Sequence, residues 1–365
     1  MEDVERYLLG ARRTLTRIEV AERAGVPIEV AQELWGQLGF PHAADDDVAF
    51  TEQDVEALRT TVSLVELGIV EPDSQAALVR TWGHSYARLA EWQTSLLAGI
   101  ALADDDPTAR LDDLLTEVLP RVGALQDYIW RRHLENAAQR LLPQVDGRDE
   151  ATRSTVGFTD IVDYTRRSKN LTESELVDLV EVFEAEATRA VVAVGGRVIK
   201  TIGDEILYVV DDPAAAVAVA LALAERGEDE ADAFPRVRTG LAFGTVTPRL
   251  GDVFGPTVNI AARLTSVARP GTVLLDRGAY DVLTGAEEPP DTASESAPDG
   301  TPLAPITRLL DRAADELAEI SPLSEHGDLR FRRLRRVSVK GYRHLEPFVV
   351  RLRRPRGADG TPEDE

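Results

Sequence analysis

The 365-residue sequence contains no cysteine, which excludes disulfide bonds, thiol nucleophiles and thiolate zinc sites. Long apolar runs are also missing. The longest, Ala214 to Ala224, is much shorter than the roughly 20 residues that a membrane-spanning helix needs. The charged N-terminus, MEDVERYLLGARR, has no apolar core of the kind found in secretory signals. We therefore expect a soluble protein, and the lack of cysteine fits a cytoplasmic location.

Positive charge is scarce as well. There are 41 basic against 64 acidic residues, which gives a formal net charge of -23. Proteins that coat nucleic acid or an anionic membrane need positive surface, so neither role is expected. A small polyanion could still bind if cations came with it. The apolar fraction of 43% supplies material for two buried cores, and we expect two domains.

Residues 1–147 are predicted to form an all-α regulatory domain, because apolar residues recur at helical spacing and no long alternating pattern occurs. Two short helical patterns joined at Ala24 to Pro27 are typical of a helix-turn-helix. However, residues 11–60 carry five basic and ten acidic residues, and Glu29 and Glu33 would face the phosphates, so DNA binding is not expected. The long amphipathic patterns that follow predict either a self-covering bundle or a dimerising domain.

Residues 148–355 alternate strand and helix patterns, which predicts an α+β domain with one sheet covered by helices. Residues 236–249 are expected to form one strand, and residues 335–352 a closing hairpin. Residues 286–305 have the composition of a disordered insert, and residues 356–365 that of a disordered tail. Between the insert and the hairpin, the apolar spacing predicts a helix over residues 306–320.

An acidic pair, Asp204–Glu205, lies in a glycine-marked turn between two β-branched runs. This pattern is first of all a hairpin signal, and it does not reveal alone whether a carboxylate holds a metal. Three further motifs accompany it: GFTDIVDYT from Gly157, GDVFGPTVNIAARL from Gly251 and VSVKGY from Val337. In this order and spacing the four motifs resemble the class III nucleotidyl cyclases.

The resemblance covers about residues 153–352 and implies a ferredoxin-like βαββαβ core. It also implies a lyase activity, the conversion of ATP to 3',5'-cyclic AMP and pyrophosphate. The helical region before it resembles, more loosely, the regulatory region of actinobacterial class III adenylyl cyclases, including the mycobacterial pH-sensing ones.

Two carboxylates are expected to hold the catalytic metals. Asp160 follows an apolar strand and Asp204 lies in the hairpin turn, so both can converge on a pair of hard divalent cations, Mg²⁺ or Mn²⁺. Two such ions can lower the pKa of an attacking hydroxyl and stabilise the leaving oxygens. The resemblance adds Ile161 as a third metal ligand.

The resemblance also implies that Lys200 and Asp252 face the purine base of the substrate. An ammonium can donate to adenine N1 and a carboxylate can accept from the 6-amino group, whereas guanine would mismatch both, so ATP is the expected substrate. Asn259 and Arg263 are four residues apart and share a helix face. The family uses such residues to orient the ribose and stabilise the transition state. Lys340 matches the lysine that binds the β- and γ-phosphates.

The loop after the first strand is expected to wrap the triphosphate with backbone N–H groups. The substrate-binding residues expected there are Phe158, Thr159, Ile161 and Val162. The commonest family form places glycine where this chain has Asp163, so we expect that carboxylate to point outward.

The family divides each active site between two catalytic domains, so this chain, with one such domain and both residue sets, is expected to act as a homodimer. The N-terminal domain could restrain the catalytic domains, with pH or a bound apolar ligand as the relieving signal. His84 and His133 lie on its helices and could change charge between pH 5 and 8.

Two other functions are considered. A diguanylate cyclase has a similar acidic hairpin, but Ile202 stands where its signature has glycine and the Asn-x-x-x-Arg helix is foreign to it. A non-catalytic nucleotide sensor or transcription regulator could be built on an inactive cyclase domain, but no catalytic residue is missing here.

Overall fold

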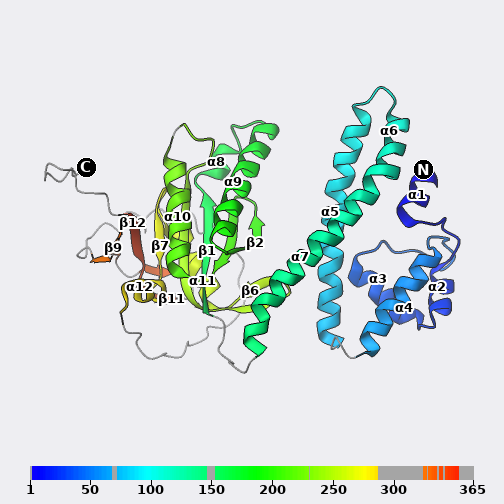
Figure 1. The fold of residues 1–365 in the computed structure, drawn as a ribbon, viewed down its shortest axis with the longest axis horizontal. Helices are drawn as coiled ribbons and strands as arrows, with labels where there is room; N and C mark the ends of the chain where they lie inside the picture. Colours follow the sequence, from blue (N-terminus) through cyan, green and yellow to red (C-terminus); the bar gives the residue numbers. More distant parts are fainter. Residues whose placement is uncertain are drawn as a thin grey trace. The chain divides into compact units, whose positions relative to one another are not determined.

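The computed structural model describes residues 2–67, 72–145, 153–229, 231–286, 324–326, 328–334, 337–339 and 342–352. The chain divides into two compact units, Met1–Asp149 and Glu150–Glu365 (Figure 1). The expected insert at 286–305, apart from Ala286, the expected helix at 306–320 and the tail at 356–365 lie outside the described residues. No helix in the described ranges combines the length and the apolar character that crossing a bilayer requires.

The N-terminal unit is built from helices. They are α1 (Glu2–Leu9), α2 (Arg17–Ala24), α3 (Ile28–Leu38), α4 (Glu52–Glu66), α5 (Pro72–Leu102), α6 (Pro107–Asp113), the π-helical turn η1 (Leu114–Val118) and α7 (Leu119–Val145).

The helix-turn-helix pattern forms α2 and α3 as the sequence predicts. Thr16 and Glu19 form a capping box at the start of α2, and Gly25 ends it in the left-handed region with a φ of 74°. Glu29 and Glu33 are exposed on α3. Acidic side chains at these positions would repel a phosphate backbone.

The C-terminal unit is organised around one mixed sheet. Within the described residues this sheet has eight strands in the order β2-β3-β1-β4-β7-β12-β9-β8. The strands are β1 (Arg153–Ile161), β2 (Arg197–Ile202), β3 (Glu205–Val210), β4 (Val237–Thr245), β7 (Val273–Leu275), β8 (Ser324–His326), β9 (Leu329–Arg333) and β12 (Phe348–Leu352). β1 pairs antiparallel with β3 on one side and with β4 on the other.

Helices cover both faces of this sheet. They are α8 (Tyr164–Arg167), α9 (Glu173–Ala193), α10 (Pro213–Glu228), α11 (Pro256–Val267) and α12 (Arg277–Thr284). One buried cluster joins Phe183 of α9 and Leu223 of α10 to the sheet, and another joins Ala261 of α11 to Val156 and Phe158 of β1. Side chains alternate along a strand, so Asp160 follows Phe158 onto the α11 side.

Two expected strands are divided in the structure. Residues 236–249 do not form one strand, because β4 ends at Thr245 and β5 (Thr247–Arg249) pairs with β6 (Asp252–Phe254) in a separate small sheet. The closing hairpin is similarly split. β10 (Val337–Val339) pairs with β11 (Tyr342–Leu345), whereas β12 joins the main sheet between β7 and β9.

Helix α11 lies unusually close to β4. A Cβ placed on Gly240 would lie 2.4 Å from the backbone nitrogen of Thr265 and 2.5 Å from the carbonyl oxygen of Ala261. The Thr265 hydroxyl also donates to the carbonyl oxygen of Phe158 at 3.1 Å. Because Gly240 has no side chain, α11 can lie this close to β4.

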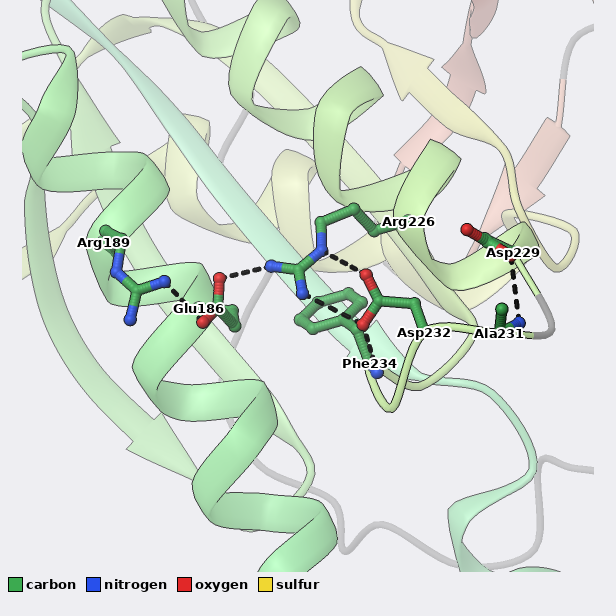
Figure 2. A network of polar contacts seen from close by, with 7 residues as sticks. All are labelled: Glu186, Arg189, Arg226, Asp229, Ala231, Asp232 and Phe234. Atoms are coloured by element: carbon green, nitrogen blue, oxygen red, sulfur yellow. Dashed lines mark hydrogen bonds and ion pairs between the residues drawn. The ribbon is translucent and has the colours of Figure 1, made fainter.

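An ion-pair network joins α9 to α10 (Figure 2). Arg226 donates from Nε to Asp232 Oδ2 at 2.7 Å and from Nη2 to Oδ1 at 2.9 Å, and its Nη1 pairs with Glu186. The guanidinium also lies over the Phe234 ring, 5.2 Å from its centre. Arg226 holds the pKa of Asp232 below its usual range, and it does the same for Glu186.

We predict that Gly240→Ala lowers the stability of the C-terminal unit by roughly 1–3 kcal/mol, because the added methyl group meets backbone atoms that cannot rotate away. Thermal unfolding followed by circular dichroism measures the change. Gly36→Ala, on α3 of the N-terminal unit, controls for the substitution itself, since a Cβ there meets nothing within 4 Å and should not lower the unfolding temperature. If Gly240→Ala unfolds at the wild-type temperature, α11 does not depend on this close approach.

We predict that Arg226→Gln lowers the melting temperature of the C-terminal unit by roughly 1–3 °C at pH 7, as expected for a partly exposed ion-pair network. The carboxylates have depressed pKa values in the fold, so their contribution is full above the unfolded values and is lost as pH falls through the folded ones. The difference from wild type should therefore shrink below about pH 4. A difference that is constant from pH 7 to pH 3 would contradict this account.

Candidate active site

Asp160 is a nearly buried carboxylate beside the end of β1. It is 8% exposed and lies opposite Glu205 of β3 and Arg238 of β4 in the strand register. Arg238 donates from Nε to Asp160 Oδ2 at 2.6 Å, and its Nη2 lies 2.5 Å from the same oxygen. Three charged side chains therefore stand side by side across β3, β1 and β4, on the face that α11 covers.

The turn between β2 and β3 brings Asp204 to the same place. Gly203 has a φ of 68°, a conformation that lets the chain reverse tightly just before the carboxylate. The carbonyl oxygen of Asp204 accepts a hydrogen bond from the Ile161 amide at 3.0 Å, which ties the turn to the end of β1. The Asp204 carboxylate is close enough to Asp160 to help raise the pKa of that group. The structure therefore places the two carboxylates close together, and their role as metal ligands stays a prediction.

Negative charge is in excess at this point. Burial raises the pKa of Asp160 to about 6, with the Asp204 carboxylate adding to the rise and Arg238 opposing it. Burial also raises the pKa of Glu205 to about 7, and the Asp160 and Asp204 charges act in the same direction. Three carboxylates share one guanidinium here, so a further cation or a proton would relieve the repulsion.

Arg238 was not singled out from the sequence. It lies within an apolar stretch, Val237 to Gly244, where a charged residue is the one signal that could have drawn attention. Its role emerges only from the strand register, because residue 238 is 78 positions away from its partner Asp160 in the chain.

Lys200 and Asp252 are also brought together. Lys200 lies on β2 and Asp252 begins β6, and the Lys200 ammonium forms an ion pair with Asp252 Oδ2. The second oxygen, Asp252 Oδ1, accepts from the Val253 amide at 2.8 Å, which fixes the carboxylate. The side chains are 44% and 27% exposed, so a ligand can reach both.

Asn259 and Arg263 lie one turn apart on α11. The helix begins after Gly255, whose φ of 130° few other residues adopt, and Pro256 occupies its first turn. Asn259 is exposed and Arg263 is partly buried. Neither side chain makes a hydrogen bond or an ion pair with another residue that the structure describes, so both are available to a ligand or to a second chain.

The loop residues differ from the sequence expectation. Phe158 and Thr159 lie inside β1 between two paired strands, and their side chains are buried. The Ile161 amide donates to Asp204 and the Val162 amide donates to the Arg236 carbonyl at 2.9 Å. These N–H groups are already used by the sheet and its edges, so in this conformation they do not form the expected phosphate cradle.

The remaining expected site residues are placed as follows. Asp163 has a φ of 58°, which explains why glycine is common at such a position, and its exposed carboxylate lies 3.0 Å from Arg166. Lys340 lies outside the described residues. His84 and His133 are exposed on α5 and α7.

The donor set suits hard divalent cations that a ligand helps to hold. Among the described residues no group of three or more acidic, histidine or cysteine side chains has the arrangement of a self-sufficient metal site. Two converging carboxylates, Asp160 and Asp204, supply oxygen donors, and Mg²⁺ typically binds through one or two carboxylates together with substrate phosphates. The residues therefore fit a cation that arrives with a phosphorylated ligand.

Comparison with known proteins agrees with this geometry. Residues 148–297 match the adenylate and guanylate cyclase catalytic domain. A protein named adenylate cyclase from Glutamicibacter nicotianae is 40% identical over 294 residues, which cover 75% of this chain and 72% of the relative. Adenylate cyclases from Streptomyces coelicolor and Streptomyces griseus are 40% and 34% identical, over 80% and 97% of this chain and 77% and 90% of their own lengths. With relatives this similar over most of their length, the chain belongs to the adenylate and guanylate cyclase family.

Proposed function

We propose that this protein is an adenylate cyclase that converts ATP to 3',5'-cyclic AMP and pyrophosphate. The observation that carries the proposal is the convergence of Asp160 and Asp204 beside Arg238, in a chain whose relatives are named adenylate cyclases. The reaction joins the ribose 3'-oxygen to the α-phosphorus and breaks the bond from that phosphorus to the bridging oxygen of pyrophosphate. The hydroxyl proton leaves as the new bond forms.

Asp160 and Asp204, with the carbonyl oxygen of Ile161, would hold two divalent cations. Such ions, when bound, lower the pKa of the 3'-hydroxyl and neutralise charge on the leaving phosphates. In the structure Arg238 forms an ion pair with Asp160. A guanidinium at this place can also donate to a phosphate oxygen, so Arg238 joins the residues that we assign to the triphosphate.

Base selection is assigned to Lys200 and Asp252. Their contact across β2 and β6 holds a donor and an acceptor side by side before any ligand arrives. Adenine can replace this ion pair by accepting from Lys200 at N1 and donating its 6-amino group to Asp252. Guanine presents the opposite pattern at both edges and would leave both groups mismatched.

Asn259 and Arg263 are assigned to the ribose and to the charge that develops on the α-phosphate. Their freedom from contacts within the described chain supports this role, because a donor that acts in the transition state should not be occupied in the resting protein. Together with Lys340 they would complete the site of a second copy, so the active form would be a homodimer with two shared sites.

The fold supports the same assignment. The element order β1-α9-β2-β3-α10-β4, with strand order β2-β3-β1-β4, supports a ferredoxin-like βαββαβ core within the larger sheet. We also propose that the N-terminal unit controls the catalytic units. The signals that we predict for this control are a change of pH or the binding of an apolar ligand.

The direct test incubates the purified full chain with ATP or GTP and with Mg²⁺ or Mn²⁺. Chromatography should detect cyclic AMP and an equal amount of pyrophosphate, with little or no cyclic GMP. Release of inorganic phosphate without a cyclic product would identify a phosphohydrolase instead, and no reaction with any nucleotide would favour a non-catalytic sensor.

We predict that Asp160→Asn and Asp204→Asn each reduce the rate of cyclic AMP formation by roughly 10²-fold or more, since loss of a metal ligand removes several kcal/mol of transition-state stabilisation. Asp163→Asn is the matched control, because that carboxylate is exposed and pairs with Arg166. It should keep near wild-type activity. Equal effects of all three substitutions would contradict the metal assignment.

We predict that mixing the inactive variants Asp204→Asn and Asn259→Ala restores activity. One mixed dimer contains one site with neither substitution, so random exchange should restore about a quarter of the wild-type number of intact sites. Subunit exchange is verified independently with two affinity tags. If mixed dimers form and remain inactive, the two residues act within one chain and the shared-site proposal is wrong.

A further inference from the structure

Arg238 is the cation at the carboxylate cluster formed by Asp160, Asp204 and Glu205. Its side chain is 35% exposed and reaches from β4 to Asp160, whose side chain is 12% exposed. Nε and Nη2 both lie at one oxygen, Asp160 Oδ2, at 2.6 and 2.5 Å. The charge of Arg238 also opposes the rise in the pKa of Glu205. Among the described residues, Arg238 is the one cation that acts on both of these carboxylates.

A second arginine, two positions earlier, forms a pair of a different kind. Arg236 places Nε 2.6 Å from Glu228 Oε1 and Nη2 2.9 Å from Oε2, so each nitrogen has its own carboxylate oxygen. In this two-bond geometry an arginine and a carboxylate match each other fully. Arg238 instead directs two nitrogens to one oxygen of Asp160. The Arg238 contact therefore balances charge without the geometry of a strong structural pair.

The guanidinium of Arg238 can leave Asp160 without disturbing the sheet. The backbones of both residues are held by the ladder between β1 and β4, so only the long, partly exposed side chain has to move. An arginine keeps its positive charge throughout the range of pH in which proteins work. It therefore needs another anion when it leaves, and a triphosphate offers several oxygens that suit the guanidinium fork.

We propose that Arg238 is a resident counter-ion that makes the binding of divalent cations depend on the nucleotide. In the resting protein its guanidinium lies at Asp160, where its positive charge opposes the approach of a divalent cation. When a nucleoside triphosphate enters, the guanidinium passes from Asp160 to phosphate oxygens, and the carboxylates become available to the cations that accompany the nucleotide. The identity of this ligand rests on the proposed function.

The charges of the cluster give this exchange a purpose. Without Arg238, three neighbouring carboxylates would attract divalent cations whether or not a substrate is present. With Arg238 in place, cation and nucleotide favour each other's binding, and by linkage each raises the affinity for the other by the same factor. The resting protein thereby avoids holding a cation tightly before its substrate arrives.

The test measures Mn²⁺ binding to the full chain without nucleotide, at pH 8, by electron paramagnetic resonance of the free ion. Arg238→Gln removes the charge and Arg238→Lys keeps it. The matched control is Arg236→Gln, which removes an equal charge from the same segment and breaks the exposed pair with Glu228. A fourth variant, Asp204→Asn/Arg238→Gln, shows whether any gained site lies at the cluster. Circular dichroism checks that every variant is folded.

We expect Arg238→Gln to bind Mn²⁺ at least roughly 10-fold more tightly than the wild type, because the positive charge nearest Asp160 is gone. Arg238→Lys and Arg236→Gln should bind like the wild type, and Asp204→Asn should abolish the gain. Wild-type affinity in Arg238→Gln would overturn the proposal. An equal gain in Arg236→Gln, or a gain that survives Asp204→Asn, would also overturn it.

A second pair of variants applies if Asp160 without its partner prevents folding. Glu205→Gln removes one negative charge from the cluster, so Glu205→Gln/Arg238→Gln has the same net charge as the wild type. The double variant should bind Mn²⁺ at least roughly 10-fold more tightly than Glu205→Gln alone. Equal affinities of these two proteins would contradict the role of Arg238.

Cyclic AMP formation by the wild type is measured separately. If Arg238→Gln gains affinity for Mn²⁺ but the wild type forms no cyclic AMP, the resident counter-ion is supported and the proposed function is wrong. If the wild type forms cyclic AMP and Arg238→Gln gains no affinity, the proposed function is supported and the resident counter-ion is wrong.

Discussion

The proposed site depends on one electrostatic constraint, which is that the Asp160 carboxylate is buried in the sheet and has little contact with water. Glu205 and Arg238 are its neighbours on the adjoining strands, and the Gly203 turn adds Asp204. Burial raises the pKa values of Asp160 and Glu205, and the excess of three carboxylates over one guanidinium adds to the rise. We propose a cation-binding function on this ground, because divalent cations bound with a polyphosphate would supply the missing positive charge.

The surrounding fold keeps this arrangement in register. β1 is paired on both sides, so Asp160 cannot shift without breaking two ladders. Gly240 lets α11 lie directly on β4, and Thr265 bonds to the Phe158 carbonyl on β1. The helix that carries Asn259 and Arg263 is thereby held at a fixed height and orientation on the sheet.

Much of this could be predicted from the sequence, because alternation and helical spacing are local signals. The convergence of Asp160 with Asp204 followed from a strand end and a glycine turn, and the Lys200–Asp252 pair from family motifs. Arg238 could not be found in this way, since only long-range strand pairing places it at Asp160. The bonding of the Ile161 and Val162 amides could not be predicted either, because the motif does not reveal which carbonyl groups lie opposite them. On α5 and α7 the sequence showed amphipathic helices, but only the fold shows that large apolar side chains such as Trp92 and Trp130 stay exposed within the unit.

The central claim is that Asp160 and Asp204 hold two divalent cations together with ATP, and counting bound ions tests it most directly. Mn²⁺ is titrated into the full chain with 3'-deoxy-ATP, which cannot cyclise, and free Mn²⁺ is measured by electron paramagnetic resonance. The account predicts two tightly bound ions per occupied site, nucleotide-dependent binding, and loss of at least one ion in Asp204→Asn. The same number of bound ions in Asp204→Asn as in wild type would contradict it.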